Sequence, residues 1–243
     1  MGGALLWALF AASSLIVGGA LALWFRISER ALGLIMAFGA GVLISAVAYE
    51  LVAEAFDTAA GSGSLALGLA AGALTFFVGD ACIDRMGGEN RKSMTRAPEA
   101  GSALAIVLGI VLDGVPESAV IGLGLLSGEG VSVAVIAAVF LSNLPEAIAA
   151  TTGLARGGWA SRNIIGLWVL VTAVSGLASL LGYALFDSAG PSGLAFVLAF
   201  AAGAILTMLA DTMMPEAFQH GGKLVGLLTT LGFGLAFALS MLD

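Results

Sequence analysis

The chain has 243 residues, of which 60% are hydrophobic and only 10% are charged, and its mean hydropathy is +1.07. Soluble domains carry about 25% charged residues, so this composition excludes a water-soluble enzyme, a nucleic-acid-binding protein and a disordered chain. Nine Lys and Arg against sixteen Asp and Glu give a net charge of −7, which is unusual for a protein that sits in an anionic membrane. The single cysteine excludes a disulfide framework and a cysteine-rich metal site.

Apolar runs follow one another along nearly the whole chain. A bilayer core of about 30 Å needs roughly 20 apolar residues per helix, and breaks at Gly, Ser, Pro and charged residues divide the chain into eight such runs. They predict an all-α, polytopic membrane protein with a single domain over residues 1–243 and a cytoplasmic loop at 86–100. The expected spans are 4–25, 31–56, 64–83, 101–126, 131–154, 160–186, 193–218 and 222–242.

The basic residues predict the orientation. If eight spans start from an outside N-terminus, all nine Lys and Arg fall on the cytoplasmic side, as the positive-inside rule requires. We therefore expect a protein of the plasma (bacterial inner) membrane with both termini outside the cytoplasm. No basic residue precedes the first span, which favours a permanent helix over a cleaved signal peptide.

Two internal similarities indicate a repeat. Residues 200–218 align without gaps on 38–56, and residues 141–147 align on 112–118. The eight spans divide into three spans, a pair and three further spans. The second set of three therefore starts from the opposite side of the membrane from the first, so the pattern predicts a 3+2+3 inverted repeat. Transporters use such repeats to alternate access around a site near the membrane midplane.

The middle of the fourth and fifth spans carries the candidate chemistry. The fourth contains Leu-Asp-Gly-Val-Pro-Glu-Ser at 112–118, and the fifth contains Leu-Ser-Asn-Leu-Pro-Glu-Ala at 141–147. In each, polar residues four apart share a helix face, and the proline frees the carbonyl of the leucine one turn earlier. Intramembrane carboxylates are costly and are functional by default, so the motifs predict an oxygen-lined cation site. Its candidate metal ligands are Asp113, Glu117, Ser142, Asn143 and Glu146.

Further acidic residues near the span ends predict a route to and from this site. Glu50 and Glu54 lie toward the outer end of the second span, whereas Asp80, Asp211 and Glu216 lie toward the inner ends of the third and seventh. For Glu54 and Glu216, solvation at the interface is an equal alternative. His220, beside two glycines at the inner end, is interpreted either as a solvated helix-end residue or as an exit ligand.

The paired Pro-Glu motifs resemble those of the ZIP (Zrt-/Irt-like protein) metal transporters, and so does Asp-Thr-Met-Met-Pro-Glu at 211–216. The resemblance covers essentially the whole chain. It implies transport of zinc, iron or manganese into the cytoplasm by an elevator-type motion, with spans one, four, five and six moving against the rest. It also implies ligation by Glu117 and Glu146, completed by Asp113, Ser142 and Asn143, and a homodimer, since many relatives form dimers.

The chain departs from that family in its core. The family has His-Asn where this chain has Asp113 and Gly114, and neither central motif contains histidine. An all-oxygen shell suits manganese, magnesium or calcium and accepts iron(II), whereas zinc favours imidazole or thiolate. The divalent metal is expected as substrate, and no cofactor is predicted.

Two alternatives remain beside a divalent-metal transporter that is not an enzyme. A related transporter of a different ion would account for the missing histidines. An intramembrane aspartyl protease would need two aspartates that share a proton. The pair Asp80 and Asp113 is disfavoured for that role because Asp80 is expected near the inner surface.

Overall fold

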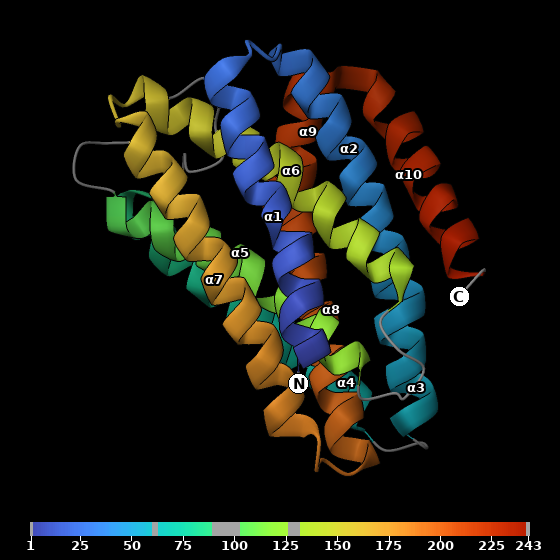
Figure 1. The fold of residues 1–243 in the computed structure, drawn as a ribbon. Helices are drawn as coiled ribbons and strands as arrows, with labels where there is room; N and C mark the ends of the chain where they lie inside the picture. The colour runs from blue at the N-terminus through green and yellow to red at the C-terminus, as the bar shows by residue number, and fades with distance from the viewer. Residues whose placement is uncertain (1, 60–62, 89–102, 126–131, 242–243) are drawn as a thin grey trace.

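The computed structural model describes residues 2–59, 63–88, 103–125 and 132–241 (Figure 1). These residues form an all-helical bundle with no β-strand in the described ranges. Most of the expected cytoplasmic loop at 86–100, with three of the basic residues that predict the orientation, lies outside the described residues. Every Lys and Arg within the described ranges is exposed.

The helices begin and end within three residues of the expected spans, apart from a short π-helical extension after α4. Two long helices change to π-helical geometry partway along, at 47–52 and at 209–213, and the chain turns through a short 3-10 segment before α10. In chain order the elements are α1 (Gly2–Trp24), α2 (Glu29–Ala46), a π-helix (Val47–Val52), α3 (Ala53–Ala59), α4 (Ser64–Ile83), a π-helix (Asp84–Gly88), α5 (Ala103–Gly124), α6 (Val133–Arg156), α7 (Ser161–Phe186), α8 (Pro191–Met208), a π-helix (Leu209–Met213), α9 (Met214–Gly221), a 3-10 turn (Gly222–Leu224) and α10 (Val225–Ser240).

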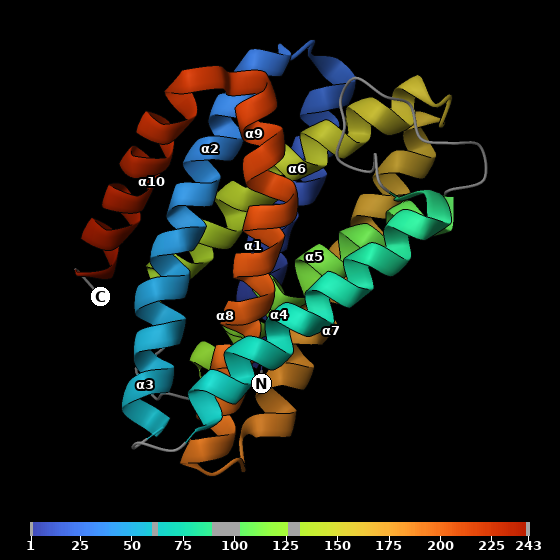
Figure 2. The same ribbon diagram turned by 180° about the vertical axis from the view of Figure 1, so that it is seen from behind.

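Seven helical stretches in the described residues are long and apolar enough to cross a membrane, judged by length and composition. The last of them runs over residues 191–240. Gly222 interrupts it with a backbone φ of 63°, which a residue with a side chain rarely adopts. At this point α9 ends, and α10 returns along α2 (Figures 1 and 2).

The helices pack as two groups. In the first, which we call the core group, α1 packs along α6 and α7, and α5 packs along α7. In the second, the frame group, α2 packs along α9 and α10, while α4 packs along α8 (Figure 2). The two groups meet mainly where α2 crosses α6 and where α8 crosses α5.

Within the frame group, α2 and α10 approach until their backbones touch. A Cβ added at Gly41 of α2 would lie 1.9 Å from the Thr229 carbonyl oxygen, and one added at Gly232 of α10 would lie 2.1 Å from the Phe38 carbonyl oxygen. Small residues allow such close approach between membrane helices, where lipid provides no hydrophobic driving force for their association. This pair therefore has no layer of side chains at its closest point.

The pair α4 and α8 repeats this contact. A Cβ at Gly203 of α8 would lie 2.2 Å from the Leu69 carbonyl oxygen, and one at Gly72 of α4 would lie 1.9 Å from the Phe200 carbonyl oxygen. In the alignment of 200–218 on 38–56, Phe200 and Gly203 take the places of Phe38 and Gly41. The two aligned segments thus make the same backbone contacts, each with a different partner helix.

The π-helical turns also fall at matching places. The turn after α2 begins at Val47 and the turn after α8 begins at Leu209, and these two residues are aligned in the internal similarity. Single π-turns inside α-helices are rare and often occur at functional sites. The shared local geometry therefore extends the similarity from sequence to backbone conformation.

Candidate metal-binding site

The five candidate ligands are all buried on α5 and α6, the two helices of the core group that face the frame group. Their exposed fractions are 2% for Asp113, 1% for Glu117, 0% for Ser142, 3% for Asn143 and 8% for Glu146. Both helices continue through their prolines, Pro116 and Pro145. Burial of three carboxylates in a chain with so few charges is the main polar feature of the interior.

One hydrogen-bonded contact joins the two motifs. The Ser142 hydroxyl lies 3.2 and 3.3 Å from the two carboxylate oxygens of Glu117, to which it donates, and 3.1 Å from the Val139 carbonyl oxygen. The neighbouring Ser118 instead donates to the Gly114 carbonyl of its own helix at 2.7 Å. The structure therefore brings Glu117 and Ser142, two of the candidate ligands, together and leaves Ser118 outside this contact.

The two glutamates face different spaces. Glu146 and Asn143 line a cavity of about 10 Å³ inside the core group. That volume is about what one water molecule requires. Glu117 lines a second cavity of the same size, between the core and frame groups, whose other lining residues are all apolar. The candidate ligands therefore divide between an inner compartment and the boundary between the groups.

Trp168 of α7 forms a wall of the inner compartment, and the sequence motifs do not include it. Its indole is 1% exposed, and its Nε1 donates to Thr151 Oγ1 of α6 at 2.8 Å. The ring also packs on Gly19 of α1, where an added Cβ would lie 2.4 Å from Cδ1. The sequence does carry a signal for this residue. Trp168 lies well inside an expected span, away from the membrane interface that indoles favour.

The proline of α6 frees the carbonyl group of Leu141, one turn earlier on the helix. The Leu141 carbonyl oxygen packs against α2, where a Cβ added at Gly39 would lie 3.0 Å from it. It therefore faces the frame group at a point where α2 has no side chain. Gly114, in turn, brings no side chain to the inner compartment, and the Ser175 hydroxyl of α7 lies 3.8 Å from where its Cβ would be.

The described residues contain no group of three His, Cys, Asp or Glu side chains close enough together to hold a metal ion. The arrangement instead offers carboxylate, hydroxyl and amide oxygens spread over two adjacent helices. Oxygen ligands of this kind suit hard divalent cations, which also retain water in their shells.

The acidic residues proposed for the route are not gathered with the site. Glu50, in the first π-turn, accepts a hydrogen bond from Ser240 of α10. Glu50 and Glu54 are half-buried, whereas Asp211, in the matching π-turn after α8, is exposed. These residues lie on the frame group, so any route they form runs along the boundary between the groups.

His220 is not a solvated helix-end residue. Its side chain is 6% exposed, with Nε2 3.3 Å from Glu216 Oε1 and Nδ1 3.6 Å from Glu29 Oε2. The close approach of α2 and α9, where Gly33 packs against Gly221, encloses the imidazole between the two helices. Glu216 and His220 therefore form one cluster with a glutamate that the sequence motifs did not indicate.

Asp80 lies deeper in its helical rod than expected. The helix continues past Ile83 in π-helical geometry until Gly87, whose backbone φ of 91° is not helical, so Asp80 lies roughly one and a half turns inside its end. Gly79, the residue before it, packs against Leu112, the residue before Asp113; an added Cβ would lie 3.1 Å from the leucine side chain. Asp80 therefore lies closer to the level of Asp113 along the bundle than its place toward the end of the third span predicts.

Comparison of the sequence with models of protein families and with curated proteins finds no match.

Proposed function

We propose that the chain is a transporter of divalent metal cations whose substrate binds between α5 and α6. The observation that carries the proposal is the burial of Asp113, Glu117 and Glu146 beside the Ser142 hydroxyl and the Asn143 amide. The buried part of the described chain contains these three carboxylates and no Lys or Arg, so its formal charge is negative. A negative, oxygen-rich interior attracts a hard cation and repels an anion.

The fold supports transport rather than permanent binding. Counting residues 191–240 as two crossings, because of the turn at Gly222, gives eight spans in a 3+2+3 inverted repeat. The matched backbone contacts of α2 with α10 and of α8 with α4 support this arrangement. In it, each half of the frame group approaches the site from an opposite face of the membrane, as alternating access requires.

The division into two groups supports an elevator-type motion. The core group contains the spans that the ZIP resemblance assigns to the moving part, and the frame group contains the remaining spans. Both groups have close backbone contacts at glycines, such as Gly122 against the Ser179 carbonyl in the core group and Gly41 against the Thr229 carbonyl in the frame group, so each can move as a unit; the resemblance makes the frame group the stationary one in this proposal. The core group would then carry the cation past them, with Glu50 and Glu54 at the entrance and Asp80, Asp211, Glu216 and His220 at the exit.

The ligand chemistry favours manganese or iron(II) as substrate. The candidate shell contains only oxygen, because the family's central histidine is replaced by Asp113. Imidazole and thiolate, which zinc prefers, are absent from both motifs. We place the protein in a bacterial inner membrane with both termini outside, on the positive-inside rule.

Uptake into liposomes tests the proposal. The purified protein is reconstituted around a metal-sensitive dye and challenged with Mn²⁺, Fe²⁺, Zn²⁺ and oxyanions in turn. Metal should enter the wild-type vesicles with saturation, and Glu117→Gln or Glu146→Gln should lower the apparent affinity by more than about tenfold, since even outer-shell changes at metal sites cost 10–100-fold. Ser118→Ala is the matched control because Ser118 is equally buried on α5 but bonds only to its own helix.

Equal uptake by wild type and both glutamine variants would reject the assignment. Uptake of an oxyanion instead of metal would favour a transporter of another ion. The packing of Gly79 on Leu112 keeps the protease alternative testable: cleavage of a membrane peptide that Asp113→Asn abolishes, without metal uptake, would favour that class.

A further inference from the structure

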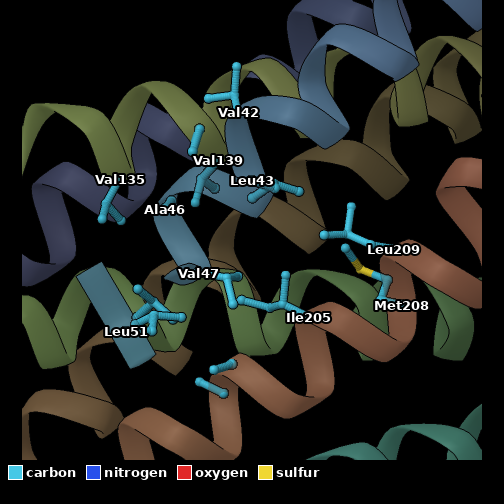
Figure 3. Close-up of a cluster of buried hydrophobic side chains, with 14 of the residues drawn as sticks. Val42, Leu43, Ala46, Val47, Leu51, Val135, Val139, Ile205, Met208 and Leu209 are labelled. Carbon is cyan, nitrogen blue, oxygen red and sulfur yellow. The ribbon is translucent and has the colours of Figure 1, made fainter. Parts of the chain in front are cut away.

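A strip of apolar side chains closes the boundary between the two groups on one side of Glu117. The frame group contributes Leu43, Val47 and Leu51, which recur every four residues, and α6 contributes Val135 and Val139 (Figure 3). Each of the five is at most 6% exposed. They line one cavity together with Glu117 and with Ile205 of α8, and they lie toward the end of the bundle where α6 begins. We call these five residues the first seal.

The first seal is a barrier to a hydrated cation. A charged group pays a large desolvation penalty when it enters an apolar environment, and hydrophobic constrictions gate ion pathways by excluding water. The cavity beneath the seal has room for about one water molecule. Glu117 is therefore closed off from the end of the bundle at which α6 begins.

The frame part of this seal has a counterpart in the internal similarity. The alignment of 200–218 on 38–56 pairs its three residues with three others that are also apolar and at most 3% exposed. Leu43, Val47 and Leu51 correspond to Ile205, Leu209 and Met213. Each strip contains a π-turn that begins at the same aligned position.

The α6 part has a counterpart on α5. The alignment of the two Pro-Glu motifs, continued toward the start of each helix, pairs Val135 with Ile106 and Val139 with Ile110. The environments of the two pairs differ. Val135 and Val139 share a hydrophobic cluster with the frame helices, whereas Ile106 and Ile110 pack in a separate cluster with Trp168 inside the core group.

The aligned residues of α5 and α6 thus occupy unequal environments, whereas the two aligned strips of the frame group share one hydrophobic cluster. Asymmetry between α5 and α6 is expected when an inverted repeat is caught in one of two states. We propose that Ile205, Leu209 and Met213 form a second seal with Ile106 and Ile110 in the other state of the transporter, and that this seal closes as the first one opens. The role of the seals in transport rests on the proposed function, whereas the choice of residues rests on the internal repeat. Each matched π-turn lies within one of the two sets of frame residues, which would lose its contact with α6 or gain a contact with α5 as the transporter changes state.

Cross-linking between paired cysteines tests the proposal. The native thiol is first removed by Cys82→Ser, because Cys82 is exposed. One variant carries Val47→Cys with Val139→Cys, and the other carries Leu209→Cys with Ile110→Cys. A short, reducible thiol-reactive cross-linker should join both pairs, and each cross-link should stop metal uptake until it is reduced.

The matched control for the second pair is Leu209→Cys with Leu108→Cys. Leu108 is on the same helix as Ile110 but two residues away, and it is 40% exposed on the outer surface of the bundle. This control should not cross-link. Cross-linking of Leu209→Cys with Ile110→Cys at no more than the control rate would overturn the second seal, as would normal uptake by protein fully cross-linked at the first seal.

The result separates this inference from the proposed function, because cross-linking is measured on the protein whether or not it transports. If metal uptake is intact but the second pair does not cross-link, the proposed second seal is rejected and the proposed function is retained. If both pairs cross-link but no metal is taken up, the proposed function is rejected and the two seals are retained. If a double variant does not fold, Val47→Cys alone decides: a membrane-impermeant maleimide should label it faster when substrate is present, and an unchanged rate would overturn the alternation.

Discussion

Replacement of Gly232 by alanine is the sharpest test of the frame group. The new Cβ would lie 2.1 Å from the Phe38 carbonyl oxygen, whereas a carbon–oxygen contact normally needs about 3.3–3.6 Å. The obstacle is backbone, so α10 must move away from α2 by more than about 1 Å. Overpacking of this kind costs about 1–3 kcal/mol, and we expect Gly232→Ala to lose that amount of unfolding free energy relative to an alanine at an uncrowded position of the same helix.

Gly234→Ala is the matched control on the same helix. No atom lies within 4 Å of the place where its Cβ would be, and alanine is favoured over glycine in a helix by about 1 kcal/mol. The exchange of glycine for alanine brings this gain at both positions, so the two variants should differ by the overpacking cost alone, about 1–3 kcal/mol. At about 2–4 °C per kcal/mol for a chain of this size, their melting temperatures should differ by about 2–12 °C.

Thermal unfolding in one detergent, followed by tryptophan fluorescence and by loss of the monodisperse peak in size-exclusion chromatography, measures this difference. Gly72→Ala should reproduce the loss in the other helix pair, because its Cβ would lie 1.9 Å from the Phe200 carbonyl oxygen. Equal melting temperatures for Gly232→Ala and Gly234→Ala would refute the claim that α2 and α10 touch through their backbones.

Three further predictions concern the site. Thr151→Val removes the acceptor of the buried Trp168 N–H and should lower the free energy of unfolding by about 1–3 kcal/mol; denaturant titration measures it, and no loss would contradict the contact. Ser142→Ala should weaken apparent metal affinity in the liposome assay while Ser118→Ala does not, and equal effects would mean that the Glu117 contact is irrelevant to binding. Metal uptake should weaken as pH falls, because protons compete with metal for carboxylates; initial rates measured with equal pH on both sides of the vesicle check this, and a rise toward low pH would count against carboxylate ligands.

Hydropathy predicted the helix bounds well because an apolar run of about 20 residues has few alternatives to a helix in a bilayer. It also singled out Glu117 and Ser142, since polar residues stand out against an apolar background. The structure brings these two within hydrogen-bonding distance, although the alignment of the two motifs pairs Ser142 with Asp113 and Glu146 with Glu117.

Other parts of the site depend on which helix lies beside which, and hydropathy does not determine that, because lipid tails are as apolar as the helix surfaces. The wall made by Trp168 needs α1, α6 and α7 to meet at one point. The burial of His220 needs Gly33 and Gly221 to bring α2 against α9. Asp80 lies deeper in its helix than the apolar run indicates, because the helix continues past Ile83 in π-helical geometry over residues that are not strongly apolar.

The backbone contacts at glycine also limit which substitutions the chain can accommodate. At Gly41 and Gly203 any side chain would displace a neighbouring helix. Exposed apolar positions such as Leu74 and Leu231 have room for exchange among apolar residues. Tolerance to substitution should therefore be lowest within 38–56 and 200–218, where helices touch most closely, and highest on the exposed surface.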